Sequence, residues 1–175
     1  RKPPSTYMTD AHHTWKFGAT LPPIRPHSLA KHRVLKSYLE RYVSVLTRNP
    51  AQDRLRLTLV DGFAGGGRYL DLSSCTECPG SPLIMLQAME SAQQAAQQCR
   101  SKLFQLDVEY FFIDANRSAL EHLRNVLANS PYSDLVDDSV HMIHGDFVEN
   151  VPAIITNVKK RSGAERGIYV LDNIG

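Results

Sequence analysis

Hydrophobic residues along this chain fall into short continuous runs separated by longer segments of helical periodicity. Four runs rich in Leu, Val, Ile and Phe, each closed by a glycine or an acidic residue, predict β-strands. They cover residues 55–61, 108–114, 140–144 and 168–171. Continuous apolar runs of this length are typical of strands that are buried on both faces of a sheet.

The segments around these runs predict helices. In the first segment, apolar side chains recur three and four residues apart, which makes one stripe along a helix. They are Leu35, Tyr38, Leu39, Tyr42 and Leu46. Ser28 is a candidate N-cap of this helix, which we expect to end near Pro50. Ser81-Pro82 is a typical helix start, and the other helices are expected at about 82–98, 118–129 and 151–160.

Alternation of strands and helices predicts the fold class. Such alternation is characteristic of right-handed βαβ units around a parallel sheet. We therefore expect an α/β fold with a Rossmann-like parallel sheet, preceded by a basic N-terminal arm and an amphipathic helix. The arm and helix take residues 1–50, and the sheet domain takes residues 51–175. A doubly wound sheet of this type needs about three more strands, so we expect the sheet domain to be incomplete at its C-terminus.

Charge sets the N-terminal region apart from the rest of the chain. Residues 1–50 carry nine Lys and Arg against two Asp and Glu, a net charge of +7, whereas residues 51–175 carry eleven against sixteen, a net charge of −5. Residues 1–26 read as an extended arm, which Trp15 and Phe17 would anchor because large aromatic side chains rarely stay exposed. Two interpretations stay open: the basic region contacts a polyanion such as nucleic acid, or it is a solvated tail that neutralises its own acidic domain.

Composition narrows the class of protein. The chain is 42% hydrophobic and 22% charged, which is ordinary for a soluble globular protein. No apolar run approaches the roughly 18 residues that cross a bilayer, and the N-terminus lacks the apolar core of a signal peptide. Three cysteines, an odd number, argue against a disulfide framework. We therefore expect a cytoplasmic protein.

The strongest chemical signal is the segment 61–67, which reads Asp-Gly-Phe-Ala-Gly-Gly-Gly. It follows the first predicted strand, and ligands bind at the carboxyl ends of parallel strands. Glycines there let a ligand approach the backbone closely. A nicotinamide-binding fingerprint would read G-x-G-x-x-G and run straight into a helix, whereas here the helix waits until about residue 82. The candidate ligand contacts are Asp61, Gly62, Phe63, Ala64, Gly65 and Gly67; the alternative is a glycine-rich turn without a ligand.

Two further acids follow predicted strands. Asp114 ends the second strand, where an acid typically accepts hydrogen bonds from both hydroxyls of an adenosine ribose. The alternative is that Asp114 caps the following helix, which Asn116 could also do. Asp146, after the third strand, could accept a hydrogen bond from the adenine amino group, or it could simply cap the next helix. The ribose role is favoured for Asp114, and both alternatives stay open for Asp146.

Cysteine and histidine positions indicate no metal site. Cys75 and Cys78 form a C-x-x-C pair and Cys99 is a candidate third ligand, but a structural zinc site needs four ligands and no fourth is evident. Two loop thiols are the simpler interpretation. The histidines of the basic region, His12, His13, His27 and His32, need no ligand, and no Ser/His/Asp constellation is evident in the sequence.

Three segments in this order resemble the three-Cys-motif partner (TcmP) family. They are residues 27–39, the loop region 60–69 and residues 79–83, and the likeness extends from about Trp15 to the end of the chain. The family is similar to class I S-adenosylmethionine-dependent methyltransferases, so the resemblance implies the N-terminal half of that fold and adenosylmethionine as cofactor. It also implies a bacterial cytoplasmic protein that acts beside a cysteine-rich three-Cys-motif protein.

The chain departs from this family after the fourth strand. Members tend to carry an acid-Pro-aromatic-Gly motif there, whereas this chain has Asp172-Asn173-Ile174-Gly175. Asp172 is the candidate catalytic residue, since an acid beside the transferable group can orient a nucleophile or take its proton. The aromatic residue that stacks on a flipped base in amino methyltransferases is missing, which argues against methylation of a base nitrogen.

Two functions remain. The first is methyl transfer from S-adenosylmethionine, with nucleic acid as one acceptor to consider. The second is a non-catalytic module that holds an adenosyl ligand and works with the cysteine-rich partner. The glycine spacing disfavours a third, a nicotinamide-dependent enzyme.

Overall fold

A parallel four-stranded sheet forms the centre of the protein. The computed structural model describes residues 15, 18–160 and 166–171. The sheet contains β1 (Arg54–Asp61), β4 (Gln105–Asp114), β5 (Val140–His144) and β6 (Arg166–Val170), in the spatial order β5-β4-β1-β6. Relative to the chain, the order is third, second, first, fourth, which is how a Rossmann-like sheet begins. The predicted α/β fold with a parallel sheet is confirmed.

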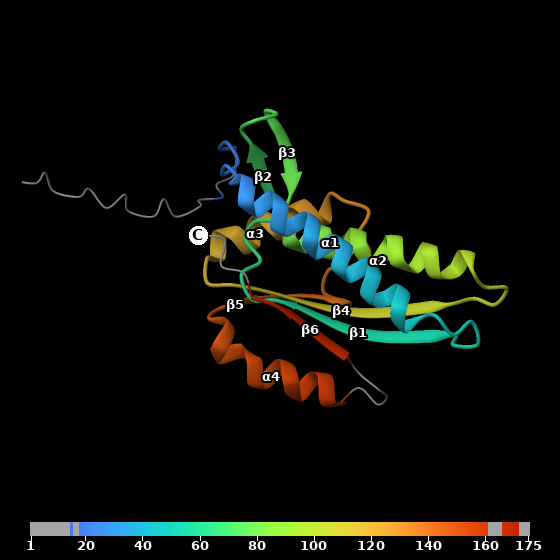
Figure 1. The fold of residues 1–175 in the computed structure, drawn as a ribbon. Coiled ribbons are helices and arrows are strands. Elements are labelled where there is room, and N and C mark those ends of the chain that lie inside the picture. Colours follow the sequence, from blue (N-terminus) through green and yellow to red (C-terminus); the bar gives the residue numbers. More distant parts are fainter. Residues whose placement is uncertain (1–14, 16–17, 161–165, 172–175) are drawn as a thin grey trace, which may run out of the picture.

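Helices cover both faces of the sheet. On one face lie α1 (Pro26–Leu46), α2 (Ser81–Gln98) and α3 (Arg117–Ala128), and on the other lies α4 (Phe147–Lys160) (Figure 1). Successive strand residues point to opposite faces, so Leu59 and Phe112 enter the core beneath the first three helices, whereas Val60 and Phe111 pack with Ile154 of α4. Burial on both faces explains why β1 and the second half of β4 read as continuous apolar runs in the sequence.

An antiparallel hairpin that the sequence did not predict lies between the glycine loop and α2. Its strands are β2 (Arg68–Asp71) and β3 (Thr76–Pro79). The hairpin projects from the face of the sheet that α1, α2 and α3 cover (Figure 1). Leu70 also pairs with the N-terminal segment: its N–H donates to the carbonyl of Pro22 at 2.9 Å and its carbonyl accepts from Ile24 N–H at 2.9 Å. The hairpin therefore ties the segment that precedes α1 to the body.

Several predicted boundaries were wrong by a few residues. The first helix begins at Pro26 rather than after Ser28, and its N-cap is Arg25, because proline fits the first turn of a helix, where its missing N–H would be unpaired anyway. Ser28 is buried inside the helix instead of capping it. α2 has Gly80 as its N-cap, with Ser81 as its first residue. A short 3-10 helix, Ser133–Leu135, was not predicted.

Arg100 joins the C-terminal ends of α1 and α2. Its guanidinium donates to the carbonyl oxygens of Ala96 at the end of α2 and of Thr47 and Asn49 after α1. Helix ends leave carbonyls without partners inside the helix, and this one side chain satisfies carbonyls from both helices. α1 thus shares the core of the sheet domain. None of the helices in the described part of the chain combines the length and hydropathy needed to span a bilayer.

Candidate functional site

The predicted ligand loop lies where the strand order reverses. After β1, the chain continues into β4 on one side, whereas β6 lies on the other side of β1. Ligands of open parallel sheets bind at such a switch point, outside the carboxyl ends of the strands. Asp61 ends β1 and Asp114 ends β4, its parallel neighbour. The topology therefore brings the glycine loop and two of the predicted acids to one edge of the sheet.

Asp114 is bound to the glycine loop. Its Oδ2 accepts a hydrogen bond from the backbone N–H of Gly65 at 2.8 Å, and its Oδ1 accepts one from the N–H of Asn116 at 2.7 Å. The N-cap of α3 is Asn116, whose side-chain oxygen accepts from Ser118 N–H at 3.0 Å. Asn116, rather than Asp114, therefore caps α3. A carboxylate oxygen can accept more than one hydrogen bond, so the ribose contact of Asp114 stays a prediction that the geometry permits.

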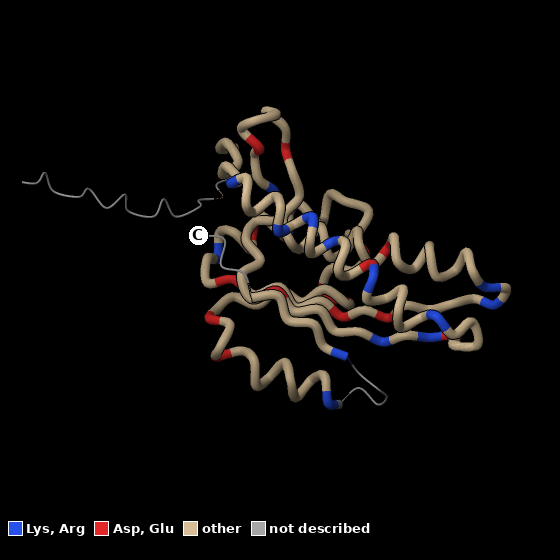
Figure 2. The backbone as a smooth tube through the Cα atoms, in the orientation of Figure 1, with Lys and Arg blue, Asp and Glu red and all other residues tan. Residues whose placement is uncertain are grey.

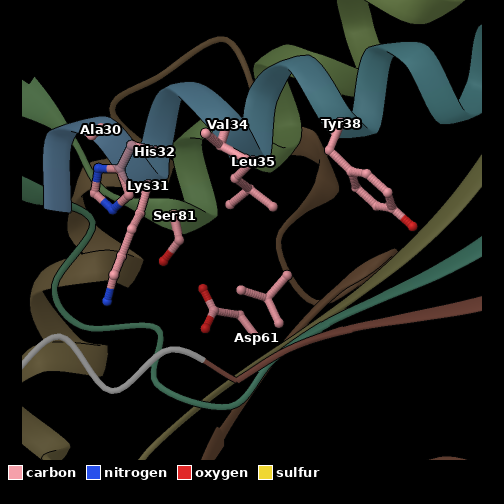
Figure 3. A pocket seen from close by; sticks show the side chains of 9 residues that line it. Ala30, Lys31, His32, Val34, Leu35, Tyr38, Asp61 and Ser81 are labelled. Carbon is pink, nitrogen blue, oxygen red and sulfur yellow. The ribbon is translucent and has the colours of Figure 1, made fainter. Parts of the chain in front are cut away.

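Asp61 lies in a pocket beneath α1. Its side chain is 1% exposed, and Oδ1 accepts from the N–H of Phe63 at 3.1 Å. The pocket has a volume of about 440 Å³, within the range of roughly 300–1,000 Å³ usual for small-molecule sites. Figure 3 shows the carboxylate turned toward the Ser81 hydroxyl, with Lys31 reaching toward the same space from α1. The residues that line it are Ala30, Lys31, His32, Val34, Leu35, Tyr38, Asp61, Ser81 and Val170.

Asp172, the candidate catalytic residue, lies outside the described residues. The last described positions of that segment are Val170, which lines the pocket, and Leu171. Gly62 is close to this strand end, because its N–H donates to the carbonyl of Val170 at 3.0 Å. The end of β6 therefore reaches the same pocket as Asp61.

Trp15 packs directly on the glycine loop. A Cβ atom added to Gly66 would lie 2.2 Å from Cδ1 of Trp15, and one added to Gly65 would lie 2.5 Å from Oη of Tyr69. The indole Nε1 donates to the carbonyl of Arg68 at 3.1 Å, and the indole meets the Tyr69 ring edge-on at 5.5 Å. The predicted anchoring of the arm by Trp15 is confirmed, whereas Phe17 lies outside the described residues. Gly65 and Gly66 are thus required by the protein's own packing, whatever ligand the loop holds.

Tyr69 and His122 complete the surroundings of the loop, and the sequence predicted neither. Burial raises the pKa of Tyr69 well above its usual value, and the nearby Asp61 and Asp114 carboxylates raise it further, so the phenol is neutral at physiological pH. His122 on α3 lies with Nδ1 2.6 Å from the carbonyl oxygen of Gly66. Both residues come from elements that only the folded chain places beside the loop.

Replacing Gly67 with alanine is expected to destabilise the protein more than replacing Gly18. Both glycines have positive φ, +81° and +75°, but a Cβ at Gly67 would lie 2.7 Å from the buried Leu123 side chain, whereas nothing lies within 4 Å of a Cβ at Gly18. The backbone strain is therefore similar, and overpacking should add about 1–2 kcal/mol at Gly67 alone. Urea denaturation of the two variants measures the difference in the free energy of unfolding. Equal losses of stability would mean that the loop shifts to accommodate the added methyl group without cost.

Asp146 caps a helix. Its Oδ1 accepts hydrogen bonds from the N–H groups of Val148 at 2.7 Å and Glu149 at 3.4 Å, at the start of α4. This is the capping role that the sequence left open. Asp146 also follows β5, the neighbour of β4, so it lies at the same edge of the sheet as Asp114, and the adenine contact stays a prediction.

The other two predicted ligand contacts of the glycine loop differ in burial. Phe63 is 39% exposed, whereas Ala64 is buried.

The cysteines lie in three separate places. Cys75 is exposed in the turn of the hairpin with φ of 52°, Cys78 is half-buried in β3, and Cys99 is exposed at the end of α2. All three are free thiols. Across the described ranges, no three His, Cys, Asp or Glu side chains gather as a metal ion would require.

Comparisons with known proteins do not assign a family. No family model matches this chain, and no curated protein matches it. The proposals below therefore depend on the site itself and on the resemblance carried by residues 27–39, 60–69 and 79–83.

Proposed function

We propose that this chain binds S-adenosylmethionine at the glycine loop and transfers its methyl group, as the resemblance to the TcmP family and to class I methyltransferases implies. One observation supports this above the others. Two acids at the ends of neighbouring parallel strands, Asp61 and Asp114, each accept a hydrogen bond from a loop amide at the switch point. This arrangement leaves carboxylates beside the loop for a ligand that carries hydroxyl and amine donors.

The residues at the site fit an adenosyl ligand. Asp114 would accept hydrogen bonds from the ribose hydroxyls, and the buried Asp61 would face the ligand's ammonium group, because a carboxylate is the strongest acceptor for a charged donor. Asp146 would accept from the adenine amino group with its remaining lone pairs. The loop residues Gly62–Gly67 would contact the ligand between these acids through their backbone atoms, since Trp15 and Tyr69 pack on the Cα positions of Gly65 and Gly66. When bound, adenosylmethionine supplies a methyl group bonded to a sulfonium sulfur. The thioether left after transfer is a good leaving group.

Catalysis would depend on Asp172, which follows β6 by two residues in the sequence. It would orient the acceptor or take its proton as a general base, and nucleic acid is the acceptor class that the basic region favours. A non-catalytic adenosyl-binding module is the alternative, and Asn173-Ile174, in place of proline and an aromatic residue, favours it. In either case a three-Cys-motif protein is the partner and the bacterial cytoplasm the location that the resemblance implies.

Calorimetry tests the binding step. We expect S-adenosylmethionine and its demethylated product to bind the wild-type chain, and a nicotinamide dinucleotide to bind more weakly. Tighter binding of the dinucleotide would contradict the proposal.

Transfer of a labelled methyl group, assayed with the three-Cys-motif partner present, separates the two functions. Asp172→Ala is expected to slow transfer and to leave the affinity for adenosylmethionine unchanged; no transfer by the wild type would favour the binding module.

A further inference from the structure

The outward face of α1 carries cations without acidic partners. Arg33, Lys36, Arg41 and Arg48 are all exposed, and none of them forms an ion pair with another described residue. Four arginines of the sheet domain, by contrast, form ion pairs with acids: Arg54–Asp107, Arg68–Glu77, Arg117–Glu121 and Arg124–Asp137.

Two of these cations lie on the helix two turns apart, and a third follows its end. Arg33 and Arg41 are eight residues apart, which corresponds to about 12 Å along the axis, and Arg48 follows the C-cap of α1, Thr47. Figure 2 shows basic positions recurring along α1. Glu40 is the acidic residue in the sequence of this helix. Ser37 and Ser44 are also exposed between the arginines. The face therefore alternates guanidinium groups with hydroxyl donors.

A groove between α1 and α2 adjoins these cations. It has a volume of about 720 Å³. Arg41, Arg48 and one acid, Glu40, line the α1 side. The small side chains of Ala92, Ala95 and Ala96 on α2 leave the groove open. Arg100 lines the groove as well, and its guanidinium donates hydrogen bonds to the backbone carbonyls of Gln52, Ala96, Thr47 and Asn49, so it adds a fixed positive charge to the groove.

Helix stability does not explain these cations. Cations stabilise the C-terminal turn of a helix, where the macrodipole is negative, and are unfavourable near its N-terminus. This accounts for Arg48 just after the last turn, but the effect fades within one turn of a helix end, so it gives no reason for Arg33 and Arg41 in the interior of α1. An anion outside the chain would neutralise these charges.

The spacing of these cations selects the kind of anion. A single phosphate is bound by donors that converge within hydrogen-bond distance of each other. Arginines about 12 Å apart on a rigid helix, with a further arginine after its end, instead match charges that are repeated along a polymer. Arg, Lys and Ser side chains are also those that contact the phosphate oxygens of nucleic acids.

We propose that the outward face of α1, together with the α1–α2 groove, binds the phosphodiester backbone of a nucleic acid. The inference rests on the nucleic-acid acceptor of the proposed function, but it does not require the adenosyl site to be occupied. Because these contacts go to the backbone, binding depends on salt and carries little sequence preference.

Two charge-matched variants test this surface. In one, Arg33, Lys36, Arg41 and Arg48 are replaced by glutamine; in the other, Arg54, Arg68, Arg117 and Arg124 are replaced by glutamine. Both remove four positive charges, and exposed ion pairs contribute little to stability, so we expect both to fold. Fluorescence anisotropy with labelled duplex DNA is measured at several salt concentrations. The α1 variant is expected to bind much more weakly, with a log–log salt slope reduced by about 0.9 for each phosphate that the protein no longer neutralises, whereas the control keeps most of the wild-type slope.

Other results would overturn the proposal. Equal losses in the two variants would mean that only net charge matters. Failure of the wild type to bind duplex DNA, single-stranded DNA and RNA would exclude the surface altogether. Calorimetry with adenosylmethionine on the same α1 variant separates this inference from the proposed function, since we expect cofactor affinity to be unchanged. Weak DNA binding with normal cofactor binding supports the surface, whereas loss of cofactor affinity would show that the substitutions disturb the domain.

Discussion

Replacing Asp114 with alanine is expected to lower the affinity for S-adenosylmethionine about a hundredfold. Two hydrogen bonds from ribose hydroxyls to a carboxylate contribute about 1.5–3 kcal/mol each, so their combined loss reaches that factor at the lower end of the range. The alanine also leaves the N–H of Gly65 without the oxygen that now lies 2.8 Å away, which loosens the loop in the same step. Isothermal calorimetry at constant pH and salt measures the change.

Two further variants make the Asp114 experiment specific. Asp114→Asn keeps an oxygen for Gly65 N–H and removes the charge, so its affinity is expected to lie between those of the wild type and the alanine variant. Asp138→Ala removes an exposed acid beside the amino-terminal end of β5 and should leave the affinity unchanged. If Asp114→Ala bound the ligand as tightly as the wild type, the ribose assignment would be wrong even though Asp114 orders the loop.

Replacing Trp15 with alanine is expected to lower the free energy of unfolding by about 3–5 kcal/mol, the usual cost of truncating a large buried aromatic side chain. Trp15 is 6% exposed and packs with Tyr69, Ile24 and Ala119. Its removal opens a cavity over Gly65 and Gly66 and deletes the hydrogen bond to the carbonyl of Arg68. Urea denaturation followed by circular dichroism measures the loss.

Controls for Trp15 separate packing from the hydrogen bond. Trp15→Phe retains an aromatic ring but no indole N–H, so its loss is expected to be smaller than that of the alanine variant. Leu103→Ala changes a side chain that is 76% exposed and should alter stability by less than about 0.5 kcal/mol. A loss below about 1 kcal/mol for Trp15→Ala would contradict a structural role. Trp15 is the chain's one tryptophan, so its fluorescence in the wild type also reports directly on the glycine loop.

The sequence by itself determined the main strands and helices. β1 and the second half of β4 are buried on both faces, and that environment accepts little but apolar residues, so the end of β4 at Asp114 was predicted correctly. β5 was also predicted with its observed bounds, although Val140 alone of its residues is fully buried. The helices α1 and α3 show an apolar stripe for a related reason, since only one side meets the core. These signals are local, because a residue's own burial decides them.

The exposed hairpin could not be predicted from the local pattern of apolar residues. β2 and β3 are four residues long, and several of their side chains face solvent. Such short polar strands have no apolar run to mark them, and pairing with the segment around Pro23 helps to hold them in place. The spatial strand order likewise depends on crossovers between distant elements, and only the folded chain shows that β6 lies beside β1.

In the candidate site, too, the sequence determined some features and the tertiary structure decided others. The sequence placed acids and glycines at the ends of strands, and the fold brought Asp61, Asp114 and the loop together as expected. Which partner each group has was decided by contacts between distant residues: Gly65 with Asp114 across 49 positions, and Trp15 with Arg68 across 53. A pattern of neighbouring residues contains no information about such pairs. Only tertiary structure could therefore show that Asp114 holds the N–H of Gly65 and that an indole covers the glycine loop, because these contacts join atoms that meet only after the chain has folded. The caps at Asn116 and Asp146 are contacts between residues two positions apart, which is why the sequence could already offer them as alternatives.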